Sequence, residues 1–246
     1  MTQTQEPLNW PTLLRRLVVT AIVLVIWFWT QSLIGARAAP ASGLGDGLHS
    51  LTAGLNSYFA RNAGAADLLL IVSSGLIDAL GLFLLARWLF GGTVRPFLGL
   101  FMLIVLRQIL QAICALPAPP GMIWHYPGFP SLLVTYHVAN DFFFSGHTAI
   151  AVFAAVELAR FRRKWLTVMA ILIVIFEVAT VLILRAHYTM DVFTGAVTAF
   201  WISNLSERVS PRIDSLLHGY GLAHVKHGFQ NLETIQNSLP KEKRPK

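Results

Sequence analysis

The sequence predicts an all-α protein, a polytopic membrane bundle of six transmembrane helices. Only 13% of its 246 residues are charged and its mean hydropathy is +0.60, whereas about 25% of the residues of soluble domains are charged. The apolar residues also gather in long runs, and a helix needs roughly 20 such residues to cross a bilayer. The chain is therefore expected to be an integral membrane protein.

Six apolar runs, separated by loops rich in glycine and proline, define the expected helices in order. The expected spans are residues 13–34, 67–89, 97–116, 143–158, 165–184 and 191–205, of which the fourth and sixth are short. Glycine and proline clusters mark turns. The sequence thus divides into an N-terminal segment 1–12, a transmembrane domain 13–205 and a polar, partly disordered tail 206–246.

The first run has a second interpretation. Arg15 and Arg16 precede it, and residues 35–39, GARAA, follow it. A charged start, an apolar stretch and small residues are typical of a cleaved secretory signal. The run is long for that purpose, so a retained span is the first choice.

The lysines and arginines predict the orientation. With six spans, all but four of the 19 fall on one side, and these four are Arg37, Arg61, Arg107 and Arg185. Because basic loops remain in the cytoplasm, both termini are expected there. The opposite loops then face the periplasm, the exterior or an organelle lumen. The net charge of +7 is explained by orientation and anionic lipid, so no nucleic-acid partner is expected.

Two polar motifs lie at the outer ends of the fourth and sixth expected spans. In FFFSGHT, residues 142–148, Gly146 lets a ligand approach the backbone, while Ser145 and Thr148 provide hydroxyl groups. His147 provides an imidazole. The amides at the start of such a helix favour a phosphate. Capping of the helix by Ser145 or Thr148 is the ordinary alternative.

The second motif is RAHYTMDV, residues 185–192. His187 and Asp191 are four residues apart and would share one face of a helix. Asp191 could then hold one ring nitrogen of His187 and leave a lone pair on the other, as in nucleophilic catalysis. A local His–Asp pair at a capped helix start is the alternative. Since the topology places both motifs on one membrane face, the joint catalytic interpretation is favoured.

Four charged residues lie inside apolar spans, at similar depths by helix rise: Asp78, Arg107, Glu157 and Glu177. Charges at that depth are paired or functional. They could form a bracing network, with Asp78 against Arg107, line a polar cavity for a substrate headgroup, or mark a transport path. The aromatic residues of the loop WHYPGFP, residues 124–130, are expected at the membrane interface without a chemical role.

The two motifs resemble the type 2 phosphatidic acid phosphatase superfamily, and within it the sphingomyelin synthase branch. That branch has Asp, three residues, Ser-Gly-His-Thr and later His-Tyr-Thr-x-Asp-Val. The chain reads DFFFSGHT from Asp141 and HYTMDV from His187. The resemblance covers residues 139–195 and agrees with a six-span plan.

The resemblance implies roles for the motif residues. His187 would attack phosphorus and become a phosphohistidine, Asp191 would support it, and His147 would protonate the departing alkoxide. No metal or other cofactor is implied. The remaining motif positions are candidate substrate-binding residues, together with the two arginines nearest the motifs: Asp141, Ser145, Gly146, Thr148, Tyr188, Arg185 and Arg107.

The chain departs from the phosphatase pattern at three places. Phe144 replaces a proline, Val181 replaces an arginine, and Arg87 with Arg95 falls on the side opposite the motifs, where these arginines are interpreted as topological anchors. Arg185 either supplies the missing phosphate contact or anchors the helix end. These departures favour the synthase branch.

The sequence leaves three functions open. The first is a transferase that moves a phosphorylated headgroup between a membrane lipid donor and a lipid alcohol acceptor. The second is a lipid phosphatase that uses the same residues with water. The third is a transporter or another membrane protein without enzymatic activity. The sequence names neither the headgroup nor the acceptor, for which ceramide, diacylglycerol and a polyprenol are candidates, and it does not indicate an oligomeric state.

Overall fold

The computed structural model describes residues 10–36, 44–136 and 142–238. Every regular element in these ranges is a helix, which confirms the all-α class. The helices are α1 (Trp10–Gly35), α2 (Gly47–Leu51), α3 (Ala53–Arg61), α4 (Ala63–Leu89), α5 (Arg95–Ile113), α6 (Gly146–Ala159), α7 (Lys164–Ile183) and α8 (Thr189–Ser238).

Four of these helices are long and apolar enough to cross a membrane: α1, α4, α5 and α7. The protein is therefore an integral membrane protein. Helix α6, with 14 residues, is about 21 Å long at 1.5 Å per residue, less than the roughly 30 Å of a hydrocarbon core. Helix α8 does not end near residue 205 but continues to Ser238, so the expected boundary between the transmembrane domain and the tail falls within a helix. The expected outer loop also contains α2 and α3.

Helix α6 lies at the centre of the bundle, in contact with α4, α5, α7 and α8. Its residues are apolar around most of its circumference, as expected for a helix surrounded by others. Phe153, fully buried, packs against α5 at Gly99, where any larger side chain would overlap its ring. The central position of α6 explains how a short helix can be held within the bundle.

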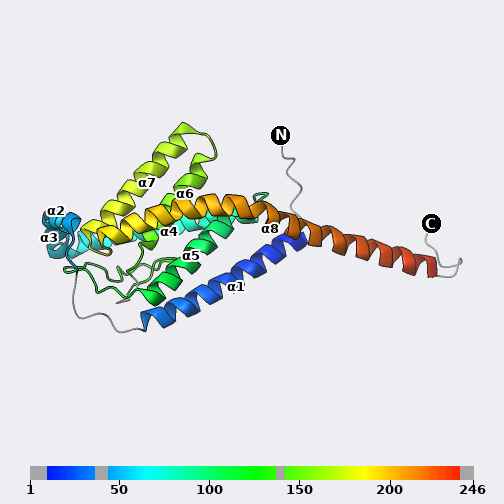
Figure 1. Cartoon of the computed structure of the whole chain (residues 1–246), viewed down its shortest axis with the longest axis horizontal. Helices are drawn as coiled ribbons and strands as arrows, with labels where there is room; N and C mark the ends of the chain where they lie inside the picture. The colour runs from blue at the N-terminus through cyan, green and yellow to red at the C-terminus, as the bar shows by residue number, and fades with distance from the viewer. Residues whose placement is uncertain (1–9, 37–43, 137–141, 239–246) are drawn as a thin grey trace.

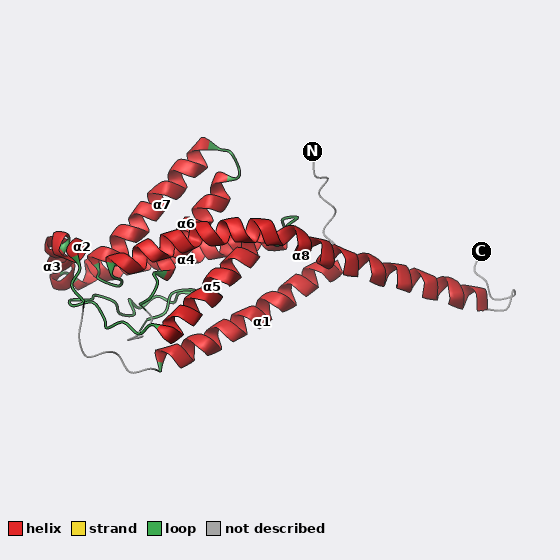
Figure 2. Ribbon diagram, in the orientation of Figure 1, coloured by secondary structure: helices red, strands yellow, loops and turns green. Residues whose placement is uncertain are grey.

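The two ends of the bundle differ. Helices α2 and α3 and the non-helical residues 114–136 gather at one end, called here the loop end, whereas α8 extends beyond the bundle at the other (Figure 1; loops in green in Figure 2). At the opposite end Arg16 of α1 donates to the carbonyl oxygens of Trp88 and Leu89, both at 2.8 Å. This contact caps the C-terminus of α4 and holds α1 to the bundle.

An ion-pair network also occupies the end opposite the loop end. Arg95, in the first turn of α5, donates to both carboxylate oxygens of Glu157, from Nε at 3.1 Å and from Nη2 at 2.9 Å. Arg160 lies 3.1 Å from Glu157 and also pairs with Glu207. Glu157 therefore lies at a helix end and not at the mid-depth position expected from the sequence.

Two further charges have neutral partners. Asp78 accepts hydrogen bonds from the Ser131 hydroxyl and from the amides of Leu132 and Leu133, all at 2.9–3.0 Å. The expected bracing pair of Asp78 with Arg107 is thus wrong. Glu177, fully buried, accepts a hydrogen bond of 2.6 Å from Ser73.

Candidate active site

The start of α6 is built by its cap. Ser145, the N-cap residue, accepts hydrogen bonds from the amide of Thr148 at 3.3 Å and from its hydroxyl at 3.1 Å. Both side chains are fully buried, so the capping alternative describes these two hydroxyls. Gly146 follows at the first helical position, where a Cβ would lie 3.2 Å from Nε of Arg107. Glycine therefore gives Arg107 room beside the helix start.

His187 lies in the short connection between α7 and α8, before the helix begins. Its Nδ1 is 2.8 Å from the carbonyl oxygen of Phe142. Because a carbonyl can only accept, Nδ1 carries the proton and Nε2 carries the lone pair. Burial, followed by the positive charge of Arg107, lowers the pKa of His187 to about 3. The imidazole is thus neutral at physiological pH and can act as a nucleophile through Nε2.

Asp191 has a different position from the one expected. Its Oδ2 accepts a hydrogen bond from the Tyr188 amide at 2.9 Å and lies 3.9 Å from Nδ1 of His187. The carboxylate thus caps the first turn of α8, while the Phe142 carbonyl holds the histidine ring. The distance is too long for a hydrogen bond.

The backbones of the two motifs are bonded to each other. The amide of Ser145 donates to the carbonyl oxygen of Asp191 at 3.0 Å. At Gly195, on the next turn of α8, a Cβ would lie 2.7 Å from the Ser145 carbonyl oxygen. The absence of a side chain there lets α8 approach the start of α6 closely, so the two motifs meet as the sequence predicted.

The motifs open onto one cavity of about 70 Å³. Since one water needs about 10–15 Å³ on this scale, the cavity has room for about five waters or a group of similar size. The polar side chains around it are those of Arg107, His147, His187 and Thr135. The remaining lining is mostly apolar and includes Trp27, Ile77, Ile104, Trp124, Leu133, Val134, Phe142 and Ile150.

Arg107 reaches this cavity from α5. Its Nε donates to the carbonyl oxygen of Phe144 at 2.9 Å, which fixes the guanidinium beside the first turn of α6. The cavity interpretation of this arginine, left open by the sequence, is therefore the one that the geometry supports. A guanidinium, the α6 amides and two imidazoles around a small space are suited to a phosphoryl group.

Two other predicted binding residues lie away from the cavity lining. Arg185 donates to the carbonyl oxygens of Pro120 at 2.6 Å and His49 at 3.4 Å. It thus joins the loop at Pro120 to helix α2, and the structure does not place it in the cavity. The Tyr188 hydroxyl accepts a hydrogen bond from the Leu44 amide at 3.1 Å. Asp141 lies outside the described residues.

Sequence reasoning missed a support beneath His187. Asp46 accepts a hydrogen bond of 2.6 Å from the Thr189 hydroxyl and also caps α2 through the amides of Leu48 and His49. Nε2 of His49 donates to the carbonyl oxygen of His187 at 2.9 Å. These residues hold the backbone on both sides of His187. Only the N-cap preference of aspartate before residues 47–51 indicated any local role for Asp46.

Two tryptophans were also missed. Trp124 was assigned to the membrane interface, yet its ring packs edge-to-face on His147, with centroids 5.2 Å apart. Trp27 reaches the same cavity from α1 and is buried. Helix α1 therefore contributes to the site. Among the described residues, no group of three or more His, Cys, Asp or Glu could hold a metal ion.

Comparisons with known proteins place these residues within a recognised family region. The family model described as AtPDCT1/2 matches residues 46–208, a stretch that includes both motifs, Arg107 and Asp46. The chain is also similar to phosphatidylcholine:diacylglycerol cholinephosphotransferase 1 of Arabidopsis thaliana, with 23% identity over 197 residues. The similarity covers 80% of this chain and 63% of the plant protein, so the chain spans less than two thirds of that relative's length.

Proposed function

The chain belongs to the AtPDCT1/2 family, and from that premise we propose that it is a membrane phosphotransferase that moves a phosphorylated headgroup from a phospholipid to a lipid alcohol. The observation that carries the proposal is the meeting of His147, His187 and Arg107 around one cavity. Their arrangement can bind a phosphodiester, attack it and protonate what leaves.

The first step loads the headgroup onto His187. Nε2 attacks the donor phosphorus and forms a P–N bond, while the bond between phosphorus and the glycerol oxygen breaks. His147 gives its proton to that oxygen, so the donor leaves as diacylglycerol. An alkoxide is a poor leaving group, and general acid catalysis of this kind contributes about 10² to 10⁴ in rate.

The surroundings stabilise the charge that develops in this step. The guanidinium of Arg107 and the amide ends of α6 face the phosphoryl oxygens. The loaded ring carries a proton on Nδ1 and phosphorus on Nε2, so it is cationic. The negative charge of Asp191, whose Oδ2 lies 3.9 Å from Nδ1, stabilises that positive charge. The Phe142 carbonyl oxygen keeps its hydrogen bond from Nδ1.

The second step transfers the headgroup. The acceptor hydroxyl gives its proton to His147, its oxygen forms a bond to phosphorus, and the P–N bond breaks. The new phosphodiester leaves and both histidines return to their first state. The relative's name gives phosphatidylcholine as its donor and diacylglycerol as its acceptor. We take phosphocholine transfer between these two classes as the first choice for this chain, and ceramide, which the sphingomyelin-synthase-like motifs suggest, as the second acceptor.

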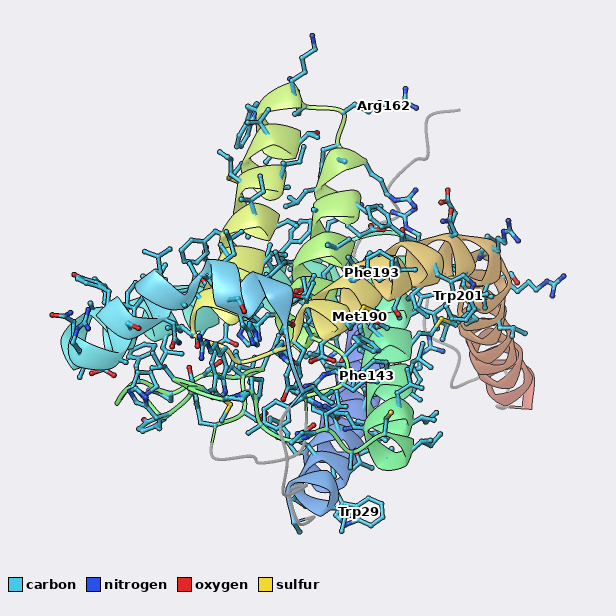
Figure 3. All side chains as sticks on the ribbon, turned by 60° about the vertical axis from the view of Figure 1, so that its left-hand side comes forward. Trp29, Phe143, Arg162, Met190, Phe193 and Trp201 are labelled. Carbon is cyan, nitrogen blue, oxygen red and sulfur yellow. The ribbon has the colours of Figure 1, made fainter. Side chains whose placement is uncertain are left out.

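The proposal includes six spans, with α6 as the fourth and the first part of α8 as the sixth. Large apolar side chains of α8 are exposed at helical spacing, as expected for a face in contact with lipid. They are Met190, Phe193, Val197, Phe200 and Trp201, of which Met190, Phe193 and Trp201 are labelled in Figure 3. In this topology both termini are cytoplasmic. The loop end, with the active site, then faces the exterior, the periplasm or a lumen.

Transfer in a defined membrane tests the proposed function. Purified protein would be placed in liposomes that contain phosphatidylcholine with an isotope-labelled headgroup and unlabelled diacylglycerol or ceramide. Mass spectrometry should find the label on the acceptor. Release of labelled phosphocholine alone would support the hydrolytic alternative, and labelled lipid that remains unchanged would contradict both enzymatic proposals.

A further inference from the structure

One face of α4 holds the non-helical segment 123–136. The residues on this face are Asp67, Ser74, Asp78 and Gly81, and each contacts that segment. Their spacings of seven, four and three residues place them along one side of a helix. Asp67 and Asp78 are about 16 Å apart at 1.5 Å per residue, so the segment is attached along a considerable length of the helix.

The attachments differ in kind. Asp67 Oδ1 lies 2.7 Å from Nε2 of His125, and the hydroxyls of Ser74 and Tyr136 are hydrogen-bonded. Leu133 packs against Gly81, where a Cβ would overlap its Cδ1. The His125 and Asp67 side chains are 45% and 39% exposed, so that pair contributes little.

Asp78 provides the strongest attachment. Its two carboxylate oxygens accept from the Ser131 hydroxyl at 2.9 and 3.0 Å and from the amides of Leu132 and Leu133 at 2.9 Å each. The Ser131 oxygen in turn accepts from the Val134 amide at 3.1 Å. Hydrogen bonds to a charged acceptor are the strong ones. Removal of this carboxylate would leave two backbone amides and a hydroxyl without their acceptor.

The segment attached in this way is a wall of the catalytic cavity. Trp124, Leu133, Val134 and Thr135 all line it. The Trp124 indole donates to the Thr135 carbonyl oxygen at 3.1 Å, and this hydrogen bond joins the beginning of the segment to its end. The Ile123 amide donates to the Leu184 carbonyl oxygen at 2.8 Å, three residues before His187. The segment therefore adjoins both histidines.

We propose that this face of α4, and Asp78 above all, positions segment 123–136 as a cover that keeps water from the loaded His187. The inference rests on the proposed function and concerns its second step. Asp78 is a positioning residue because it acts through Ser131, Leu132 and Leu133 and does not line the cavity itself.

The chemistry at stake is a competition between two acceptors. With a lipid alcohol, its oxygen bonds to phosphorus, the P–N bond breaks, and the hydroxyl proton passes to His147. With water, the same bonds form and break, and the headgroup leaves as a phosphomonoester. Exclusion of water from the site favours the first course. The position of the cover thus determines the ratio of hydrolysis to transfer.

The test measures this ratio for the whole chain in liposomes with headgroup-labelled phosphatidylcholine and diacylglycerol whose acyl chains differ from those of the donor. Labelled phosphocholine reports hydrolysis and labelled product lipid reports transfer. Asp78→Ala should raise the ratio of hydrolysis to transfer by about tenfold or more, because it removes charged hydrogen bonds. Asp78→Asn retains one oxygen acceptor and should give an intermediate ratio.

Ser73→Ala is the matched control. Ser73 lies on the same helix, is buried and donates to Glu177. Among the described residues it makes no hydrogen bond to segment 123–136. This variant should lose stability while its ratio of hydrolysis to transfer stays at the wild-type value. Ser131→Ala, which removes an attachment from the other side, should raise the ratio even where Asp78→Ala does not fold.

The outcomes separate the two proposals. Wild-type transfer with the same ratio in Asp78→Asn and Ser131→Ala would overturn the role of Asp78 and leave the proposed function standing. An equal rise in Ser73→Ala would also overturn it, because the effect would then be general destabilisation. Absence of headgroup cleavage in the wild type would overturn the proposed function, and this inference with it.

Discussion

Asp191 Oδ2 lies 3.9 Å from His187 Nδ1 while it accepts a 2.9 Å hydrogen bond from the Tyr188 amide. The carboxylate therefore makes no hydrogen bond to the ring, so the role proposed for it in the mechanism is through its charge. The ring orientation comes from the Phe142 carbonyl, 2.8 Å from Nδ1. In a Ser-His-Asp triad one aspartate both orients the histidine and stabilises its positive charge. Here the Phe142 carbonyl provides the orientation, and Asp191 is left with the second role.

The first prediction follows from that division. Asp191→Asn keeps an oxygen that can accept from the Tyr188 amide, so the variant should fold. Because it lacks the charge that stabilises the cationic phosphohistidine, its turnover should fall by about 10² to 10⁴. The measurement is kcat at saturating donor, with thermal unfolding as the control for folding. Wild-type turnover in this variant would show that the carboxylate charge has no role.

The second prediction concerns pH. The pKa of His187 is lowered to about 3 by burial and by Arg107, so the nucleophile stays neutral well below its ordinary pKa of about 6.5. In a kcat/KM profile for the donor, the wild type should show no acid limb between pH 5 and 7. An acid limb with a midpoint near 6.5 would contradict the buried, neutral nucleophile.

The same shift has a consequence for stability. The folded state disfavours the protonated ring, so the stabilisation is complete above the unfolded pKa of about 6.5 and is lost as pH falls from there toward 3. In His187→Phe, the free energy of unfolding should depend less on pH over this range. Unfolding therefore has to be monitored beside the rate in acid.

The third prediction concerns Arg107. Arg107→Lys keeps the charge but loses the planar group that bonds to Phe144 and faces the cavity, and lysine does not replace arginine at such sites. Donor cleavage should fall by about 10²-fold.

Asp78 accepts hydrogen bonds from the Ser131 hydroxyl and from the amides of Leu132 and Leu133, and not from Arg107. The double variant Asp78→Leu with Arg107→Met should therefore express no better than the worse single variant. Recovery of expression in the double variant would instead support an ion pair between Asp78 and Arg107.

The fourth prediction tests the orientation. In a Cys114→Ala background, Leu51→Cys at the end of α2, a position that is 80% exposed, should react with a membrane-impermeant maleimide added outside. Arg162→Cys, at the exposed turn between α6 and α7 (Figure 3), should react only after permeabilisation. Reaction in the opposite order would invert the topology and the placement of the site.

Part of the fold was predictable because an apolar run is a local feature of the sequence. The four helices long and apolar enough to cross a membrane, α1, α4, α5 and α7, lie where such runs were expected, and the two motifs meet as the sequence predicted. The His187–Asp191 geometry was not predictable, because the i, i+4 rule holds only within a helix. Helix α8 begins at Thr189, so His187 lies before it and turns toward Phe142.

The remaining parts of the site depend on contacts distant in sequence. Nothing near Trp27 or Trp124 indicates that they line one cavity with His147, and Asp46 bonds to Thr189 across 143 residues. The polar face of α4 could be detected in the sequence, because Ser74 and Asp78 are one helical turn apart in an apolar span. The sequence could not supply the partner, because segment 123–136 has no helical or strand period to predict its path.

The most direct test of the account is whether a phosphorylated headgroup becomes attached to His187. Wild-type protein would be mixed with headgroup-labelled phosphatidylcholine without acceptor, quenched in base and digested for mass spectrometry. We expect an acid-labile phosphoryl group on the peptide that contains His187. We expect none in His187→Ala, and loading of His147→Ala only from a donor with an acidic leaving group, such as a nitrophenyl phosphodiester. Full transfer activity in His187→Ala, or a label on another residue, would contradict the central claim.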